Sequence, residues 1–293
     1  MTWWEPVSIA VADSASMPAS GYVLAGIESR ADLEPTLRPV DLTPWLNSRV
    51  SDIFANRYLA PRSPYTTLQI PVQGIGEWCH PTMSAAIADA DALRADSIFT
   101  TPFGLPFRIA PKGENDVLYT SLWDNYPTSA TIPLSGRASH AYLLMTGSTN
   151  PMQSRIENAG VTVTYTDGST DRLPLVNPTT WAPIERDYYY DDYAFRVDHP
   201  RPYRVALADG TVSRTLGDAL GLTSGENTAK SGGADVGLTR NRDRIIPGGA
   251  AIVLDLPLNP HKQLASLTLE TRSNDVVVGL MALTLGSNEY DRP

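Results

Sequence analysis

The sequence predicts a mainly β fold, a jelly-roll-like antiparallel β-sandwich with few short helices. Short runs rich in β-branched and aromatic residues recur along the chain, and turn residues, among them 24 prolines and 21 glycines, separate them. Strands do not alternate with long helical patterns, which argues against a TIM barrel or a Rossmann fold. Strong strand signals toward the end of the chain, with long insertions before them, suit a two-sheet sandwich.

The composition is that of a globular protein with an acidic surface. The 293 residues are 42% hydrophobic and 19% charged, and a chain of this length buries a sizeable core without a disulfide or a metal. Cys79 is the single cysteine, so the chain forms no internal disulfide. The net charge of −9 disfavours nucleic-acid and membrane-surface partners, and it is compatible with a neutral ligand such as a sugar.

The first part of the chain is expected to form an N-terminal arm, residues 1–40, that packs on a sandwich domain spanning residues 41–293. The Ala-rich stretch at 84–95 is the best helix candidate in the chain. The other elements expected before residue 99 are strands at 7–11, 22–27 and 65–71 and a short helical turn within 50–58.

From residue 99 onward the strand signals become regular. The run at 139–146, SHAYLLMT, is almost continuously apolar, as in a strand that is buried on both faces. An alternating run at 161–165 is followed by Asp167-Gly168 and a return strand at 170–175, which is a strong hairpin signal. The remaining strands are expected at 103–110, 117–123, 130–134, 250–256, 264–271 and 276–285.

A polar, glycine-rich stretch at about 208–243 predicts an irregular excursion that begins with a turn at Asp209-Gly210. The N-terminus shows no basic region followed by an apolar region, so no signal peptide is visible. Apolar runs fall short of the ~20 residues that a membrane-spanning helix needs. The chain is therefore either a cytoplasmic protein, or a mature form or domain of a longer polypeptide.

Four peptides carry a resemblance to known proteins: QGIGEWCHP at 73–81, LWDNYP at 122–127, STNPMQSR at 148–155 and PIERDYYYDDYAF at 183–195. They are similar to segments of an uncharacterised bacterial family found in polysaccharide-utilisation systems. The order of strands around the GST turn and the YTDG hairpin resembles galactose-binding-like sandwich domains attached to glycoside hydrolases and polysaccharide lyases. The resemblance implies a carbohydrate context and a periplasmic or secreted location, but no particular reaction.

The first candidate site is the GEWCHP peptide. In an extended segment Glu77 and Cys79 would face one way, and Trp78 and His80 the other. Trp78 beside His80 could line a sugar subsite, because sugar C–H faces pack on aromatic rings while polar groups bind the hydroxyls. The alternative is a loop in which the tryptophan fills the core and the cysteine is buried.

The second candidate site, in LWDNYP, is at the end of a strand, where the loops of a sandwich gather ligand groups. Its residues are all common sugar contacts: Trp123, Asp124, Asn125 and Tyr126. The alternative is a structural turn, in which Asp124 and Asn125 bind their own backbone and Trp123 packs inward.

The third candidate site is the most unusual stretch, ERDYYYDDYAF. It interleaves tyrosines with acidic residues, namely Tyr188, Tyr189, Tyr190 and Tyr193 with Glu185, Asp187, Asp191 and Asp192. Tyr188 and Tyr190 would form an aromatic platform for a ligand, and the carboxylates would accept hydroxyl bonds or hold a calcium ion. The alternatives are a tyrosine-rich protein interface and a solvated strand.

Other chemistries lack their motifs. The sequence has no H-E-x-x-H, no C-x-x-C, no G-x-S-x-G and no glycine-rich nucleotide loop, so no metal site and no cofactor other than the calcium considered above is predicted. The position of His140 within an apolar run indicates a satisfied core or strand-edge histidine rather than a ligand.

Three functions therefore remain, and the first is preferred. The chain is an accessory module that binds glycan or supports a catalytic domain; or it is a structural subunit that associates with identical subunits. As the remaining alternative it is a glycoside hydrolase or lyase, whose acid and base would come from Glu77, Asp124, Asp187, Asp191 or Asp192. If the chain is an enzyme, a concave site should hold two carboxylates at working distance. A binding module should instead show an exposed aromatic platform, and a structural subunit should bury the tyrosine-rich segment against another chain.

Overall fold

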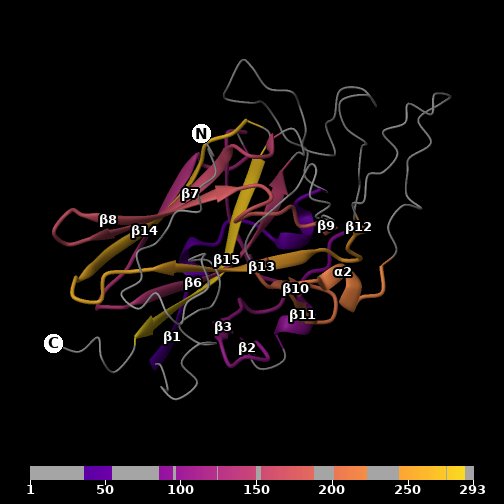
Figure 1. Ribbon diagram of the computed structural model, residues 1–293, viewed down its shortest axis with the longest axis horizontal. Helices are drawn as coiled ribbons and strands as arrows, with labels where there is room; N and C mark the ends of the chain where they lie inside the picture. The colour runs from indigo at the N-terminus through magenta and orange to yellow at the C-terminus, as the bar shows by residue number, and fades with distance from the viewer. Residues whose placement is uncertain are drawn as a thin grey trace.

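The computed structural model describes residues 36–54, 86–94, 97–123, 125–149, 153–187, 201–222, 244–274 and 276–287. In these residues the chain is mainly β, and its two larger antiparallel sheets pack face to face (Figure 1). The predicted fold class, a mainly β sandwich with few short helices, is confirmed.

The larger sheet has seven strands in the order β1-β15-β6-β13-β10-β11, and β4 also pairs with β15. The long strands at its centre arise from the apolar runs in the sequence, because a strand covered on both faces has no polar side to show. The strands are β1 (Thr36–Val40), β4 (Leu118–Ser121), β6 (His140–Thr149), β10 (Arg204–Ala206), β11 (Val212–Ser213), β13 (Ala250–Pro257) and β15 (Val276–Ser287).

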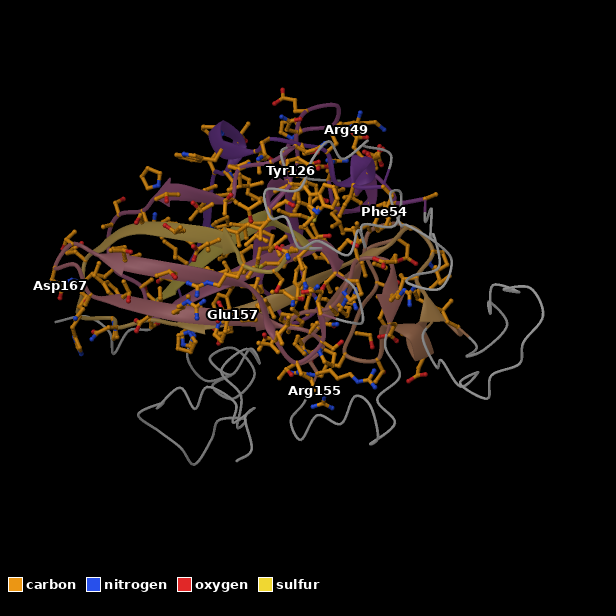
Figure 2. All side chains as sticks on the ribbon, turned by 90° about the horizontal axis from the view of Figure 1, so that it is seen from above. Arg49, Phe54, Tyr126, Arg155, Glu157 and Asp167 are labelled. Atoms are coloured by element: carbon orange, nitrogen blue, oxygen red, sulfur yellow. The ribbon has the colours of Figure 1, made fainter. Side chains whose placement is uncertain are left out.

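The smaller sheet has four strands in the order β5-β14-β7-β8. They are β5 (Ser129–Pro133), β14 (Leu264–Thr271), β7 (Glu157–Tyr165) and β8 (Thr170–Val176). The predicted hairpin is confirmed: Gly168 has a φ of +82°, and the backbone N–H of Ser169 donates to Asp167 Oδ1 over 2.9 Å. Asp167 marks the tip of this hairpin, at one end of the molecule (Figure 2).

The main core lies between the two sheets, and a second core covers the outer face of the larger sheet. Alternation along β6 shows both, because Leu143 and Met145 face the smaller sheet whereas Tyr142 and Leu144 face away from it. The prediction that this strand is buried on both faces is confirmed.

Short elements cover the outer face of the larger sheet. They are the 3-10 turns η2 (Val50–Asp52) and η4 (Asp91–Leu93) and the strands β2 (Ile98–Thr100) and β3 (Pro106–Arg108). The 3-10 turn η1 (Thr43–Trp45) packs instead on the main core through Trp45. A buried ion pair fastens this layer, with Arg94 Nη2 2.5 Å from Asp116 Oδ2. The other carboxylate oxygen of Asp116 accepts from the N–H of Val50 over 2.6 Å. Three segments that are distant in sequence are thus joined by one carboxylate.

The predicted helix at 84–95 is wrong for its described part, residues 86–94. Ile87 instead forms a parallel bridge with Gly248, and Ala90 has a left-handed φ of 57°. The bridge engages backbone groups that a helix would use, so non-local pairing overrides the helix propensity of alanine. Only the three residues of η4 are helical in this part.

Two other predicted segments differ from the structure in their bounds or their content. The strand expected at 103–110 is restricted to β3, because Gly104, with a φ of +86°, closes a tight turn back to Thr101. The excursion at 208–243 begins with the predicted turn at Asp209-Gly210 and then contains β11 and the one-turn helix α2 (Leu216–Ala219). The strands expected at 7–11, 22–27 and 65–71 lie outside the described residues.

Two very short strands, which the sequence did not indicate, pair at one end of the sandwich. They are β9 (Arg186–Asp187) and β12 (Arg244–Ile245). Figure 1 shows them together with β10, β11 and α2 at the end of the molecule opposite to the β7–β8 hairpin. Among the described residues, no helix has the length and apolar character needed to cross a membrane.

Candidate binding pocket

The acidic peptide of the third candidate site begins inside the protein. Glu185, Arg186 and Asp187 are 1%, 4% and 4% exposed. Ionised side chains are rarely buried to this extent unless they are paired or have a role in binding or catalysis. The burial of these side chains therefore marks this cluster as a candidate site.

Backbone pairing explains why the cluster is buried. Trp181 anchors the preceding loop in the main core, and the N–H of Ile184 donates to the carbonyl of Gly147 in β6 over 2.7 Å. The N–H of Ile246 then donates to the carbonyl of Glu185 over 2.9 Å, and β9 pairs with β12. These hydrogen bonds hold the peptide across the end of the larger sheet.

A pocket opens beside β9. Its hollow measures about 300 Å³, including the part that is open to solvent. Ile252 of β13 belongs to the core between the sheets, so the pocket adjoins the edge of that core. We call it the arginine pocket, and it is lined by Pro178, Ala182, Asp187, Arg201, Pro202, Arg204, Arg214 and Ile252.

Arg204 forms the inner wall of the arginine pocket and is 4% exposed. Its guanidinium donates to the carbonyls of Pro183 and Arg186 over 2.9 and 3.0 Å, and to those of Ala250 and Ala251 over 3.3 Å each. These bonds hold the side chain rigidly against β9 and β13. The accepting carbonyls are neutral, so these four bonds bring no opposing charge of their own.

Arg214 also lines the pocket and contacts both backbone and an aromatic ring. Its Nη1 donates to the carbonyl of Arg201 over 2.5 Å, and its guanidinium carbon lies 4.1 Å from the centre of the Tyr203 ring. Tyr203 in turn packs on Phe103, with 4.7 Å between ring centroids. A guanidinium that rests on an aromatic face is oriented before any ligand arrives.

Asp187 supplies the carboxylate of the described lining. Its Oδ2 accepts from the backbone N–H of Gly217 in α2 over 2.9 Å, and its Oδ1 lies 4.0 Å from Arg201 Nη1. The described lining thus combines three guanidinium groups with one carboxylate. Such a set places hydrogen-bond donors and an acceptor side by side.

Among the described residues that line the pocket, Asp187 is the one carboxylate, and Glu185 does not line it. A glycosidase uses two carboxylates. In the described part of the chain, no three His, Cys, Asp or Glu side chains converge to hold a metal ion.

The described residues of the LWDNYP peptide do not line the arginine pocket. Trp123 is 1% exposed and its Nε1 donates to the carbonyl of Asn274 over 3.0 Å, as expected if the tryptophan packs inward. Tyr126 is also buried, with its hydroxyl 3.1 Å from Ser48 Oγ, and Asn125 is half-buried. None of these three lines the pocket. Figure 2 shows Tyr126 on the same side of the molecule as Arg49 and Phe54.

The other predicted site residues lie outside the described residues, and their roles stay predictions. They are Glu77, Trp78, Cys79, His80, Asp124, Tyr188, Tyr190, Asp191 and Asp192. The sequence nevertheless connects the tyrosine-rich segment to the pocket at both ends, because residues 188–200 follow Asp187 and precede Arg201.

His140 is engaged within the protein, in agreement with its interpretation as a satisfied strand-edge residue. Its Nδ1 lies 2.9 Å from Asp255 Oδ1, and its ring stacks on Tyr142 at an interplanar angle of 2°. Burial raises the pKa of Asp255, and the imidazole of His140 opposes that rise. The pair belongs to β6 and β13 and does not line the arginine pocket.

Sequence reasoning did not single out Arg201, Arg204 or Arg214. The available signal was weak: two arginines bracket Pro202-Tyr203 directly after the tyrosine-rich segment, in a chain that is poor in basic residues. The chain matches no known family model and no curated protein sequence. The resemblance to galactose-binding-like domains therefore depends on the quoted peptides alone.

Proposed function

We propose that this chain is a non-catalytic, carbohydrate-associated module of the galactose-binding-like, jelly-roll-like type, and that it binds glycan in the arginine pocket. The observation that carries the proposal is the pocket itself, in which Arg201 and Arg214 line the same hollow as Asp187, whose carboxylate accepts from a backbone N–H. Sugars offer hydroxyl groups that both donate and accept hydrogen bonds. Guanidinium donors beside a carboxylate acceptor match that chemistry.

Among the described residues that line the pocket Asp187 is the one carboxylate, whereas a glycosidase uses two, so the pocket favours binding over hydrolysis. Rigid support for its arginines also favours recognition. Arg204 is fixed by four carbonyls and Arg214 by an aromatic ring, so little side-chain freedom would be lost when a ligand binds.

A glycan array combined with a hydrolysis screen on the same preparation of the full chain tests the proposal. We expect retention of at least one class of glycan and no release of product. Arg201→Gln and Arg214→Gln should each weaken retention by about tenfold or more, since each removes a charged donor that contacts the ligand.

Arg272→Gln is the matched control. Arg272 is half-exposed and pairs with Glu270 and Glu157 on the smaller sheet, so its loss should leave both stability and retention unchanged. Release of product from the retained glycan would contradict the proposal, because it would show that the chain is an enzyme. Retention that is insensitive to both pocket variants would place the binding site elsewhere.

A further inference from the structure

We propose that Arg38 and Arg137 form a docking surface for a short acidic segment of a partner protein. Both side chains are exposed. Arg38 lies in β1, and Arg137 lies in the loop between β5 and β6. We call these two residues the docking pair. They do not line the arginine pocket, so the inference goes beyond glycan binding.

The docking pair is distinguished by its charge. In the part of the chain that the structure describes, neither guanidinium of the pair forms an ion pair. A further exposed arginine, Arg108, has Asp41 nearby: hydrogen bonds from Thr43 and, to a smaller extent, the charge of Arg108 lower the pKa of that carboxyl. Other cations of the described surface pair with an aspartate or a glutamate, namely Arg49, Lys112, Arg172, Lys262 and Arg272.

Strand pairing brings the two arginines together. Arg38 is opposite Leu285 in the β1–β15 ladder, and its Nη2 donates to the carbonyl of Ser135 over 3.0 Å. A Cβ placed on Gly136 would lie 3.6 Å from the same nitrogen. The Arg38 guanidinium therefore lies against the two residues that directly precede Arg137, and the pair occupies one surface.

The loop that carries Arg137 is fixed on both sides. The N–H of Leu264 donates to the carbonyl of Gly136 over 2.8 Å, and Ser287 Oγ donates to the carbonyl of Arg137 over 3.3 Å. The amide of Gln263, in the orientation that satisfies both of its ends, donates to Gly136 over 3.1 Å and accepts from Arg137 Nε over 3.3 Å. Since a guanidinium has five N–H donors, most donors of the pair remain available to a partner on a rigid support.

The chemistry of the surface selects the class of partner. Guanidinium groups bind carboxylates through paired N–H donors. A lone small anion gains little at exposed donors, because solvent screens each pair, whereas carboxylates on one polypeptide bind together. The net charge of −9 repels uniformly anionic polymers and membranes. The pair therefore suits a protein whose negative charge is confined to a short segment, and it would set the register of docking.

The docking pair and the arginine pocket lie toward opposite ends of β6. The loop of Arg137 precedes His140, the first residue of the strand. Near the other end of β6, the carbonyl of Gly147 accepts from Ile184, in the loop that lines the pocket. A rise of about 3.3 Å per residue separates the two ends of this stretch by roughly 20 Å. A partner on the pair would thus leave the pocket uncovered.

A matched pair of peptides provides the test. One peptide has four glutamates separated by glycines, and the other has glutamines in their place. Each is titrated into the full, ¹⁵N-labelled chain at low salt, and the dissociation constant is taken from the arginine Nε–H signals. We expect the glutamate peptide to bind more tightly, and Arg38→Gln and Arg137→Gln should each weaken it by about two- to fivefold. Arg272→Gln, on the smaller sheet, is the control and should leave the affinity unchanged.

Four outcomes would overturn the inference. They are equal affinity for the two peptides, and glutamate-specific binding that survives in the Arg38→Gln/Arg137→Gln double variant. The third is displacement of the peptide by an equal concentration of inorganic sulfate, which would make the pair a simple anion site. The fourth is tighter binding after deletion of residues 288–293, which would show that Glu289 or Asp291 of the chain itself serves the pair. Glycan retention is measured separately, and thermal melts of each variant confirm folding.

Discussion

Replacement of Arg94 by methionine should destabilise the protein in a strongly pH-dependent way. Arg94 Nη2 lies 2.5 Å from Asp116 Oδ2, and Asp116 is 1% exposed. Burial raises the pKa of Asp116 to about 6, against the opposing effects of the Val50 N–H and the Arg94 guanidinium. Without Arg94 an ionised Asp116 would be buried without its cation, and breaking one side of such a pair costs about 3–5 kcal/mol.

The sign of the pH dependence follows from the raised pKa. Because the folded pKa of Asp116 is about 6 and the model value is 3.8, its carboxyl favours the folded state below pH 4 and loses that contribution as pH rises through 6. Two pKa units correspond to roughly 3 kcal/mol in the native chain. The methionine variant should move the pKa of Asp116 higher still, so its cost is largest near pH 8 and smaller near pH 5.

Urea unfolding of the native chain and of Arg94→Met at both pH values measures the difference. Asp91→Asn is the control, because it breaks only the exposed ion pairs of the same network, with Arg94 and Lys112, and should cost little at either pH. An equal cost of Arg94→Met at the two pH values would refute the reasoning, because it would mean that the lost hydrogen bonds to backbone carbonyls, and not the stranded carboxylate, set the stability.

Three further predictions concern the core and the hairpin tip. Trp181→Ala should lower the free energy of unfolding by about 3–5 kcal/mol in urea melts, since the ring is fully buried in the main core. Gly147→Ala should prevent stable folding, because the added Cβ would meet the Val277 carbonyl and lie 2.7 Å from the Trp181 ring, at a φ of +143°; a melting temperature equal to that of the native chain would contradict this. Asp167→Asn should lower the melting temperature at neutral pH and at pH 4 but not near pH 2. Hydrogen bonds from Ser169 and Lys262 lower the pKa of Asp167 to about 2. The ionised carboxylate therefore contributes to stability above pH 3.8, and this contribution is lost as pH falls through 2. A difference that persists unchanged at the lowest pH would exclude ionisation of Asp167 as its cause.

The strands that could be predicted are those whose signal is local. The apolar run of β6 and the Asp167-Gly168 hairpin appear in the sequence because burial on both faces and a left-handed turn each demand particular residues at particular spacings. The strands β13, β14 and β15 were recognised for the same reason, with boundaries shifted by at most a few residues.

Elements defined by long-range pairing left no such signal. Two-residue strands such as β9 and β12 have no periodicity to detect, and the Ala-rich segment before η4 reads as a helix until its bridge to Gly248 is known. The candidate site has the same character, since Arg201, Arg204 and Arg214 line one pocket with Asp187 only because β9 and β10 lie at the same end of the sandwich.

From the sequence alone, then, the class of fold, its central strands and its tightest turn followed, because backbone geometry and burial impose short-range patterns on a chain. The position of the arginine pocket, the inward packing of Trp123 and the loss of the expected helix were decided by tertiary structure. Each of these depends on hydrogen bonds and contacts between residues that are far apart in the chain, and composition and spacing do not record which distant partner a residue will find.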